Sequence, residues 1–146
     1  MKRIILFSLI FITLFSCNNI DNYPDSKVWK HGVYSKYDAQ KYEDIFDGLE
    51  VDVIYSQEKN DIYVGRVVAD TSKNLTLNEW LSVLKQPEKM NYWIDFKNLS
   101  EKNVESSMII LDNLNKKYRF KDNAFVESKN LKVLKIVKEH GFRTLL

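Results

Sequence analysis

Residues 49–53, Leu-Glu-Val-Asp-Val, decide how this chain is expected to fold. Successive side chains of a β-strand point to opposite faces, so Glu50 and Asp52 share one face of the predicted strand and the three apolar residues share the other. Two carboxylates this close repel each other unless a cation lies between them. The pattern fits either a half-exposed strand with two solvated acids or a divalent-metal site with oxygen ligands.

The remainder of the domain predicts strands that alternate with amphipathic helices, the arrangement of a parallel sheet with crossover helices. The strands are expected at residues 28–30, 49–55, 62–68, 92–96, 124–127 and 142–146. The helices are expected at about 38–46, from a capping box at Thr76 and Glu79 to Pro87, from an N-cap at Ser100 to Tyr118, and from Asn130 to a C-terminal Gly141.

Charged side chains gather where the predicted strands end. They are His31, Glu50, Asp52, Asp95, Lys97 and Glu127. In parallel α/β folds, ligands and catalytic residues lie at the carboxyl ends of the strands. A random scatter of charge would not favour those ends, so this coincidence favours the metal site over two solvated acids.

The first residues predict export and anchoring. Lys2 and Arg3 precede an apolar stretch, 4–15, that is shorter than the roughly 20 residues of a membrane span, so residues 1–16 are predicted to be a signal peptide. Leu-Phe-Ser-Cys at 14–17 resembles a bacterial lipobox, which implies that Cys17 is lipidated and anchors the protein to a membrane of the cell envelope, on its periplasmic or surface side. An unused lone thiol is the alternative. Residues 17–27 would then be a tether to a domain at 28–146.

Charge argues against a nucleic-acid partner. The chain has 22 basic and 20 acidic residues, and loss of Lys2 and Arg3 with the signal peptide leaves it neutral. A nucleic-acid binder is expected to carry a basic excess on one face. Residues 17–146 are enough for one domain with a core, and no repeat or linker suggests a second.

Several segments resemble the TIM-barrel phosphodiesterases, a superfamily that includes glycerophosphodiester phosphodiesterases, sphingomyelinase D enzymes and the menorin family. Trp-Lys-His-Gly at 29–32 is similar to their first-strand histidine motif, and residues 47–53 are similar to their Gly-x-Glu-x-Asp strand. Trp-Ile-Asp-Phe-Lys at 93–97 is similar to a later strand that supplies an acidic ligand and a lysine. Residues 75–81 resemble the helix before that strand in the menorin-like branch.

The resemblance implies one metal ion and a phosphodiester. Glu50, Asp52 and Asp95 would hold a single divalent cation, Mg²⁺ or Ca²⁺, that binds a phosphodiester oxygen. Lys97 would lie beside the same phosphate. His31 would act as acid or base while an internal hydroxyl or water attacks phosphorus. The expected ligands are glycerophosphodiesters or phospholipid head groups.

The chain departs from the resemblance in two respects. These enzymes use a second histidine after the third strand, but residues 64–70 contain none; Arg66 there could stabilise charge but not shuttle a proton, since guanidinium stays protonated. His140, in the last turn of a predicted helix, is expected to be structural. A complete barrel takes about 250 residues. Residues 28–146 therefore predict an incomplete (β/α) barrel with about five or six parallel strands and four helices. Truncation of the chain, a partner that completes the barrel, or an open sheet would each explain the short length, and truncation is favoured.

Two functions follow from these observations. The first is a membrane-anchored lipoprotein with a phosphodiesterase-like site, active or degenerate. The second is a non-catalytic envelope lipoprotein that binds a ligand or a protein partner through the same pocket or an uncovered sheet edge. The complete carboxylate and lysine set favours the first, whereas the missing histidine and the short chain favour the second.

Overall fold

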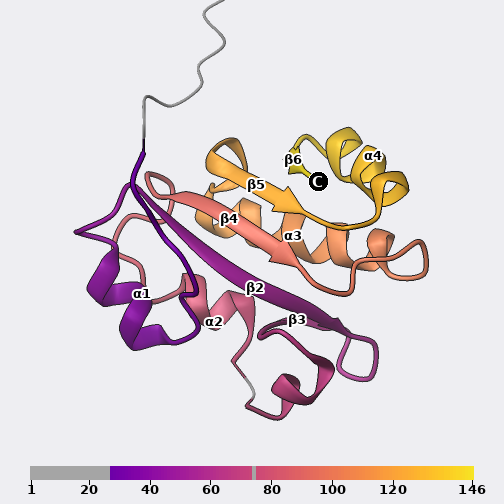
Figure 1. Cartoon of the computed structure of the whole chain (residues 1–146), viewed down its shortest axis with the longest axis horizontal. Helices are drawn as coiled ribbons and strands as arrows, with labels where there is room; N and C mark the ends of the chain where they lie inside the picture. The colour runs from indigo at the N-terminus through magenta and orange to yellow at the C-terminus, as the bar shows by residue number, and fades with distance from the viewer. Residues whose placement is uncertain (1–26, 74) are drawn as a thin grey trace, which may run out of the picture.

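A six-stranded sheet organises the computed structural model, which describes residues 27–73 and 75–146 (Figure 1). The strands are β1 Trp29–Lys30, β2 Gly48–Ser56, β3 Asp61–Val64, β4 Asn91–Phe96, β5 Ala124–Glu127 and β6 Arg143–Leu145. The helices are α1 Lys36–Tyr42, α2 Leu77–Leu81, α3 Val104–Tyr118 and α4 Leu131–Glu139, with short 3₁₀ helices η1 Val68–Lys73 and η2 Lys121–Asn123.

The predicted targeting segments lie outside these ranges. They comprise the signal peptide at 1–16, the lipidation site Cys17 and all but the last residue of the tether. Among the helices that the structure does describe, none combines the length and the apolar character needed to cross a bilayer.

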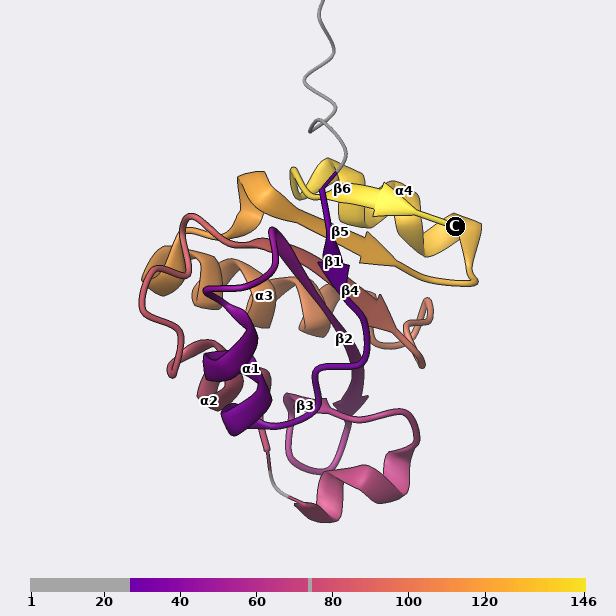
Figure 2. The ribbon, with the colours of Figure 1, turned by 60° about the vertical axis from the view of Figure 1, so that its left-hand side comes forward.

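Five of the strands are parallel and follow the order β1-β2-β4-β5-β6. Within the described ranges no pairing joins β6 back to β1, so the sheet is open rather than closed into a barrel. Figure 2 shows α3 and α4 behind the half of the sheet formed by β4, β5 and β6. The predicted α/β class, with five or six parallel strands and four helices short of a closed barrel, is confirmed.

Strand β3 differs from the expected parallel arrangement. It ends at Val64 and runs antiparallel to β2, beside the carboxyl half of that strand. Only residues 57–60 connect the two strands, and a parallel return needs a crossover of about a dozen residues or more, so a hairpin forms. The chain then turns at Gly65, where a Cβ would lie 2.4 Å from Cβ of Asp70, so no side chain fits there.

The apolar face of the sheet carries the core. Alternating residues of β2 and β4, such as Val51 and Ile94, are buried in one cluster with helical side chains that include Trp80, Met108 and Val133. Burial of each such side chain contributes about 1.5–3 kcal/mol, which holds the helices on this face. The charged residues of the same strands are thereby directed to the opposite face.

Two helix starts were predicted correctly. Thr76 and Glu79 form the capping box of α2, and the Asn130 side chain caps α4 by accepting from the amide of Lys132. Gly141 follows α4 with φ +84°, the left-handed conformation that ends many helices.

Other helix boundaries were predicted incorrectly. Helix α1 begins at Lys36 because Ser35 caps it, and α2 ends at Leu81, well before Pro87. Helix α3 begins only after Asn103, whose side chain donates to the carbonyl of Asn98 and accepts from the amide of Ser100. This local loop keeps Ser100 outside the helix.

Candidate metal centre

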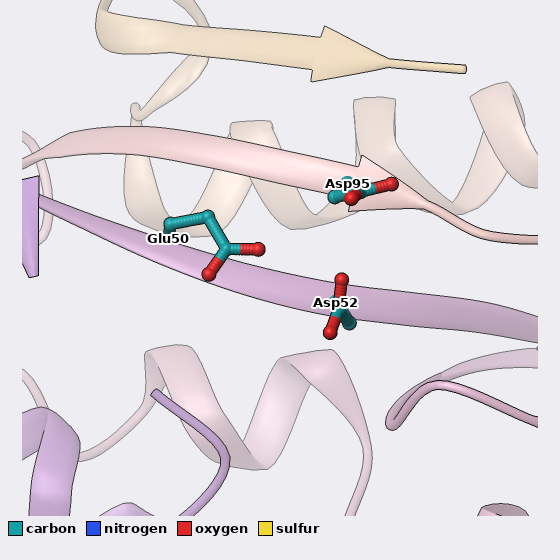
Figure 3. Close-up of side chains that lie close together, drawn as sticks. All are labelled: Glu50, Asp52 and Asp95. Atoms are coloured by element: carbon teal, nitrogen blue, oxygen red, sulfur yellow. The ribbon is translucent and has the colours of Figure 1, made fainter. Parts of the chain in front are cut away.

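The register of β2 and β4 brings three acids together. Asp52 lies directly opposite Asp95, and Glu50 lies one strand step before Asp52 on the same face (Figure 3). One carboxylate oxygen from each residue lies within 4.8 Å of the others. Glu50 is 0% exposed and Asp52 is 2% exposed, so the alternative of two solvated acids is wrong.

Glu50 has one satisfied oxygen and one orphaned oxygen. Its Oε2 accepts a hydrogen bond of 2.5 Å from the amide of Gly32 and lies 3.2 Å from Nδ1 of His31. Its Oε1 is buried and has no hydrogen-bond partner among the described residues. Burial raises the pKa of Glu50, with the Gly32 amide and His31 acting in the opposite direction.

Asp52 is bonded on both oxygens. Its Oδ1 lies 2.5 Å from Nζ of Lys97, and its Oδ2 accepts a hydrogen bond from the Tyr34 hydroxyl and lies 3.2 Å from Nε of Arg66. Burial by itself raises the pKa of this carboxyl. The hydrogen bonds from Lys97 and Tyr34 outweigh burial, and the pKa of Asp52 is lowered.

Lys97 joins the two strands electrostatically. Its ammonium contacts Oδ2 of Asp95 as well as Oδ1 of Asp52. Burial lowers the pKa of Lys97, but the hydrogen bonds to both acids outweigh it and raise the pKa overall. The predicted lysine is therefore held charged beside two of the three predicted metal ligands.

His31 lies at the rim of the same site. Its side chain is 72% exposed, and its ring makes an edge-on contact with Trp93 at 5.7 Å between centroids. Because Nδ1 faces Glu50, Nε2 is directed elsewhere, and none of the residues in the described ranges forms a hydrogen bond with it. The structure thus leaves Nε2 accessible for proton transfer.

The loop after β1 orients the carboxylates. Gly32 has φ +73°, which lets its amide donate to the carboxylate of Glu50. The next amide, that of Val33, donates to the backbone carbonyl of Glu50. The indole N–H of Trp80 holds the carbonyl of Val33 at 3.0 Å from inside the core. Such outer contacts fix ligand orientation in metal sites.

Sequence reasoning missed Tyr34. Its hydroxyl donates to Asp52, and burial together with that hydrogen bond raises the pKa of Tyr34, so the phenol stays protonated. The sequence gives no specific signal for this contact beyond the position of Tyr34 two residues after Gly32. Glu127, expected among the strand-end charges, accepts a 2.6 Å hydrogen bond from the indole of Trp93 and does not belong to the three-acid cluster.

The second histidine lies elsewhere in the molecule. His140 is the C-cap of α4, and its Nδ1 lies 2.8 Å from Oδ2 of Asp112 on α3. The predicted structural role therefore agrees with its position. Among the described residues, His31 is the only histidine at the carboxylate cluster.

The donor set suits a hard divalent cation. Three carboxylates place one oxygen each within 4.8 Å of one another, and protein groups hold the second oxygen of Glu50. Both oxygens of Asp52 already have partners, so a cation would share Oδ1 of Asp52 with Lys97 or displace that ammonium. Mg²⁺ and Ca²⁺ prefer such oxygen ligands. A buried carboxylate oxygen without a partner, Oε1 of Glu50, is costly unless a bound cation satisfies it.

Comparison with known proteins does not identify a relative. No protein-family model, curated protein or solved structure matches the chain.

Proposed function

We propose that this protein binds a phosphodiester through one divalent cation held by Glu50, Asp52 and Asp95. The observation that supports the proposal most directly is the orphaned Oε1 of Glu50, buried within the three-acid cluster. The phosphodiester would come from a glycerophosphodiester or a phospholipid head group. Lipidation of Cys17, which stays a prediction, would hold the site near such head groups.

The charges in the cluster fit a singly charged ligand. With all three carboxylates ionised and His31 neutral, the cluster holds three negative charges and the two positive charges of Lys97 and Arg66, which leaves one negative charge in excess. A divalent cation would reverse this balance to one positive charge. A phosphodiester monoanion would then neutralise the site, whereas a doubly charged phosphomonoester would not.

Hydrolysis would depend on His31 for proton transfer. Glu50 holds Nδ1, so the accessible Nε2 is the atom that would take a proton from the attacking hydroxyl or give one to the leaving oxygen. Lys97 would stabilise negative charge on the phosphate from its position between Asp52 and Asp95. The cation, when bound, would polarise a phosphoryl oxygen.

Binding without turnover is the second candidate function. Arg66 contacts Asp52 at the rim where the resemblance predicts a second histidine, and its guanidinium cannot exchange a proton near neutral pH. With His31 as the single histidine at the described site, one of the two proton transfers lacks an assigned group. This observation favours a phosphodiester-binding protein over an efficient hydrolase.

Thermal unfolding tests the cation site. A cation at 100 times its dissociation constant stabilises a folded protein by about 2.7 kcal/mol, so Mg²⁺ or Ca²⁺ should raise the melting temperature of the purified protein by several degrees. Glu50→Gln should abolish the rise. Glu105→Gln, the same change at an exposed position on α3, should retain it. No rise in the wild-type protein would contradict the proposal.

Hydrolysis of bis-p-nitrophenyl phosphate separates the two candidate functions. Cation-dependent release of p-nitrophenol that His31→Ala abolishes would identify an enzyme. Cation binding without any release would identify a binding protein. Release that survives His31→Ala unchanged would remove His31 from the mechanism.

A further inference from the structure

Arg66 lies at the carboxylate cluster but uses little of its hydrogen-bonding capacity. Its Nε lies 3.2 Å from Oδ2 of Asp52, and its side chain is 69% exposed. None of the described residues accepts a hydrogen bond from Nη1 or Nη2. The terminal nitrogens of a cationic side chain are therefore available to solvent beside the proposed metal ligands.

The backbone at Arg66 is fixed in place. The amide of Gly65 donates to the carbonyl of Asp52 at 2.9 Å, which ties the end of β3 to β2 at the cluster. One oxygen of Asp70 accepts from the amides of Arg66 and Val67, at 2.8 Å and 3.2 Å. The loop thus presents Arg66 beside Asp52 in the middle of β2.

The contact with Asp52 is not the one that an arginine makes when its task is to hold a carboxylate. Such an arginine usually binds both oxygens with two parallel N–H groups. Here Lys97 and Tyr34 already hold Asp52 from both of its oxygens, and Arg66 adds a single contact through Nε. The contact holds the guanidinium beside Asp52 and leaves its forked end without a protein partner among the described residues.

We propose that Nη1 and Nη2 of Arg66 bind a non-bridging oxygen of the phosphodiester, opposite Lys97. This inference rests on the proposed function, because the cation is expected to hold the same phosphate. Asp52 lies between the two cationic side chains, with Lys97 on one oxygen and Arg66 on the other. A phosphate above Asp52 would therefore have a positive group on each side.

Loss of Arg66 should weaken binding of the phosphodiester without weakening binding of the cation. A positive charge 3.2 Å from Asp52 opposes a cation bound to the same carboxylate, so removal of that charge should leave cation affinity unchanged or higher. Hydrogen bonds between charged groups are worth about 1.5–3 kcal/mol, so removal should weaken phosphodiester binding about ten- to a hundredfold. A merely structural arginine would instead lower cation affinity, because Asp52 would lose its orientation.

Calorimetric titration of the wild-type protein and Arg66→Gln measures both quantities. The protein is titrated first with Mg²⁺ or Ca²⁺ alone, and then, loaded with the cation, with sn-glycero-3-phosphocholine. Arg66→Lys keeps the charge without the forked donors and should recover part of the phosphodiester affinity. Lys132→Gln is the charge-matched control, because Lys132 is exposed, pairs with Glu101 and contacts none of the three acids among the described residues.

Co-sedimentation of the cation-loaded protein with phosphatidylcholine vesicles separates the two sources of the phosphodiester. Arg66-dependent binding to the soluble glycerophosphodiester, to the vesicles or to both would support the inference. Phosphodiester binding that Arg66→Gln leaves unchanged would overturn it, as would cation binding with no affinity for either phosphodiester. Absence of cation binding in the wild-type protein would instead contradict the proposed function itself.

Discussion

Two clusters within residues 27–73 and 75–146 bring carboxylates into contact with a lysine and a histidine, and they differ in how completely the charges are matched. In the cluster between α3 and α4, Asp112 binds Lys121 through one oxygen and His140 through the other. In the cluster on β2 and β4, Lys97 contacts Asp52 and Asp95, and Arg66 contacts Asp52. Glu50 lies beside His31 through one oxygen, and its other oxygen is left without a partner among the described residues.

The difference separates a structural ion cluster from a candidate binding site. Lys121 also donates to the carbonyl of His140 at 2.8 Å and lies over the ring of Phe142 at 4.7 Å, so the cluster at Asp112 ties α3 to the end of α4 and needs no further ligand. The cluster at Glu50 carries unmatched negative charge inside the protein. Proteins usually retain such unfavourable arrangements at functional sites.

The largest expected effect concerns the stability of the cation-free protein. Glu50→Gln removes a buried charge next to two other carboxylates, and the new amide could donate to them, so the free energy of unfolding should rise by about 2 kcal/mol. Denaturant unfolding in the presence of a chelator measures this change. A fall in stability would mean that the charge of Glu50 is already compensated in the folded protein, and the contrast between the two clusters would disappear.

A smaller effect is expected for the contact that orients Asp52. Tyr34→Phe deletes the hydroxyl that donates to this carboxylate and keeps the ring. Loss of an outer contact of this kind typically lowers metal affinity about tenfold or more. Titration with Mg²⁺ or Ca²⁺ measures the effect, and Tyr37→Phe, at an exposed position on α1, is the control. Equal affinities in the wild-type protein and Tyr34→Phe would show that Asp52 does not need the hydroxyl.

The smallest effect is expected in the matched cluster. Asp112→Asn should lower the free energy of unfolding by about 1 kcal/mol at neutral pH, because the side chain is partly exposed and solvent screens its ion pairs. The same substitution should leave the cation-induced rise in melting temperature unchanged. A response lost in Asp112→Asn would show that the two clusters are coupled.

At acidic pH, the wild-type protein and Asp112→Asn should have the same free energy of unfolding. Burial by itself raises the pKa of Asp112, but the hydrogen bonds from Lys121 and His140 outweigh it, and the pKa is lowered on folding. The stabilisation is therefore complete above the unfolded pKa of about 4 and is lost as the pH falls through the lower folded value. Urea unfolding at neutral pH and at progressively lower pH measures this loss.

Sequence patterns predicted strand faces and helix caps correctly where the interacting residues are close together in the sequence. Alternation placed Glu50 and Asp52 on one strand face, and the same alternation in β4 separated Asp95 from the buried Ile94 and Phe96. The capping box at Thr76 formed because its hydrogen bonds join residues within one helical turn. Helix ends were predicted less well, since loops such as the one at Asn103 compete for the same backbone groups.

The sequence by itself determined most of the strands and the shared face of Glu50, Asp52 and Asp95, because a period of two residues is enough to assign faces. Only the tertiary structure decided which groups surround those residues. The contacts of Tyr34 and Arg66 with Asp52 join loops that approach from different elements, and the antiparallel turn of β3 brings Arg66 to the cluster. The burial of Glu50 and Asp52, which leaves Oε1 of Glu50 without a partner among the described residues, likewise depends on how the helices and loops pack on the sheet.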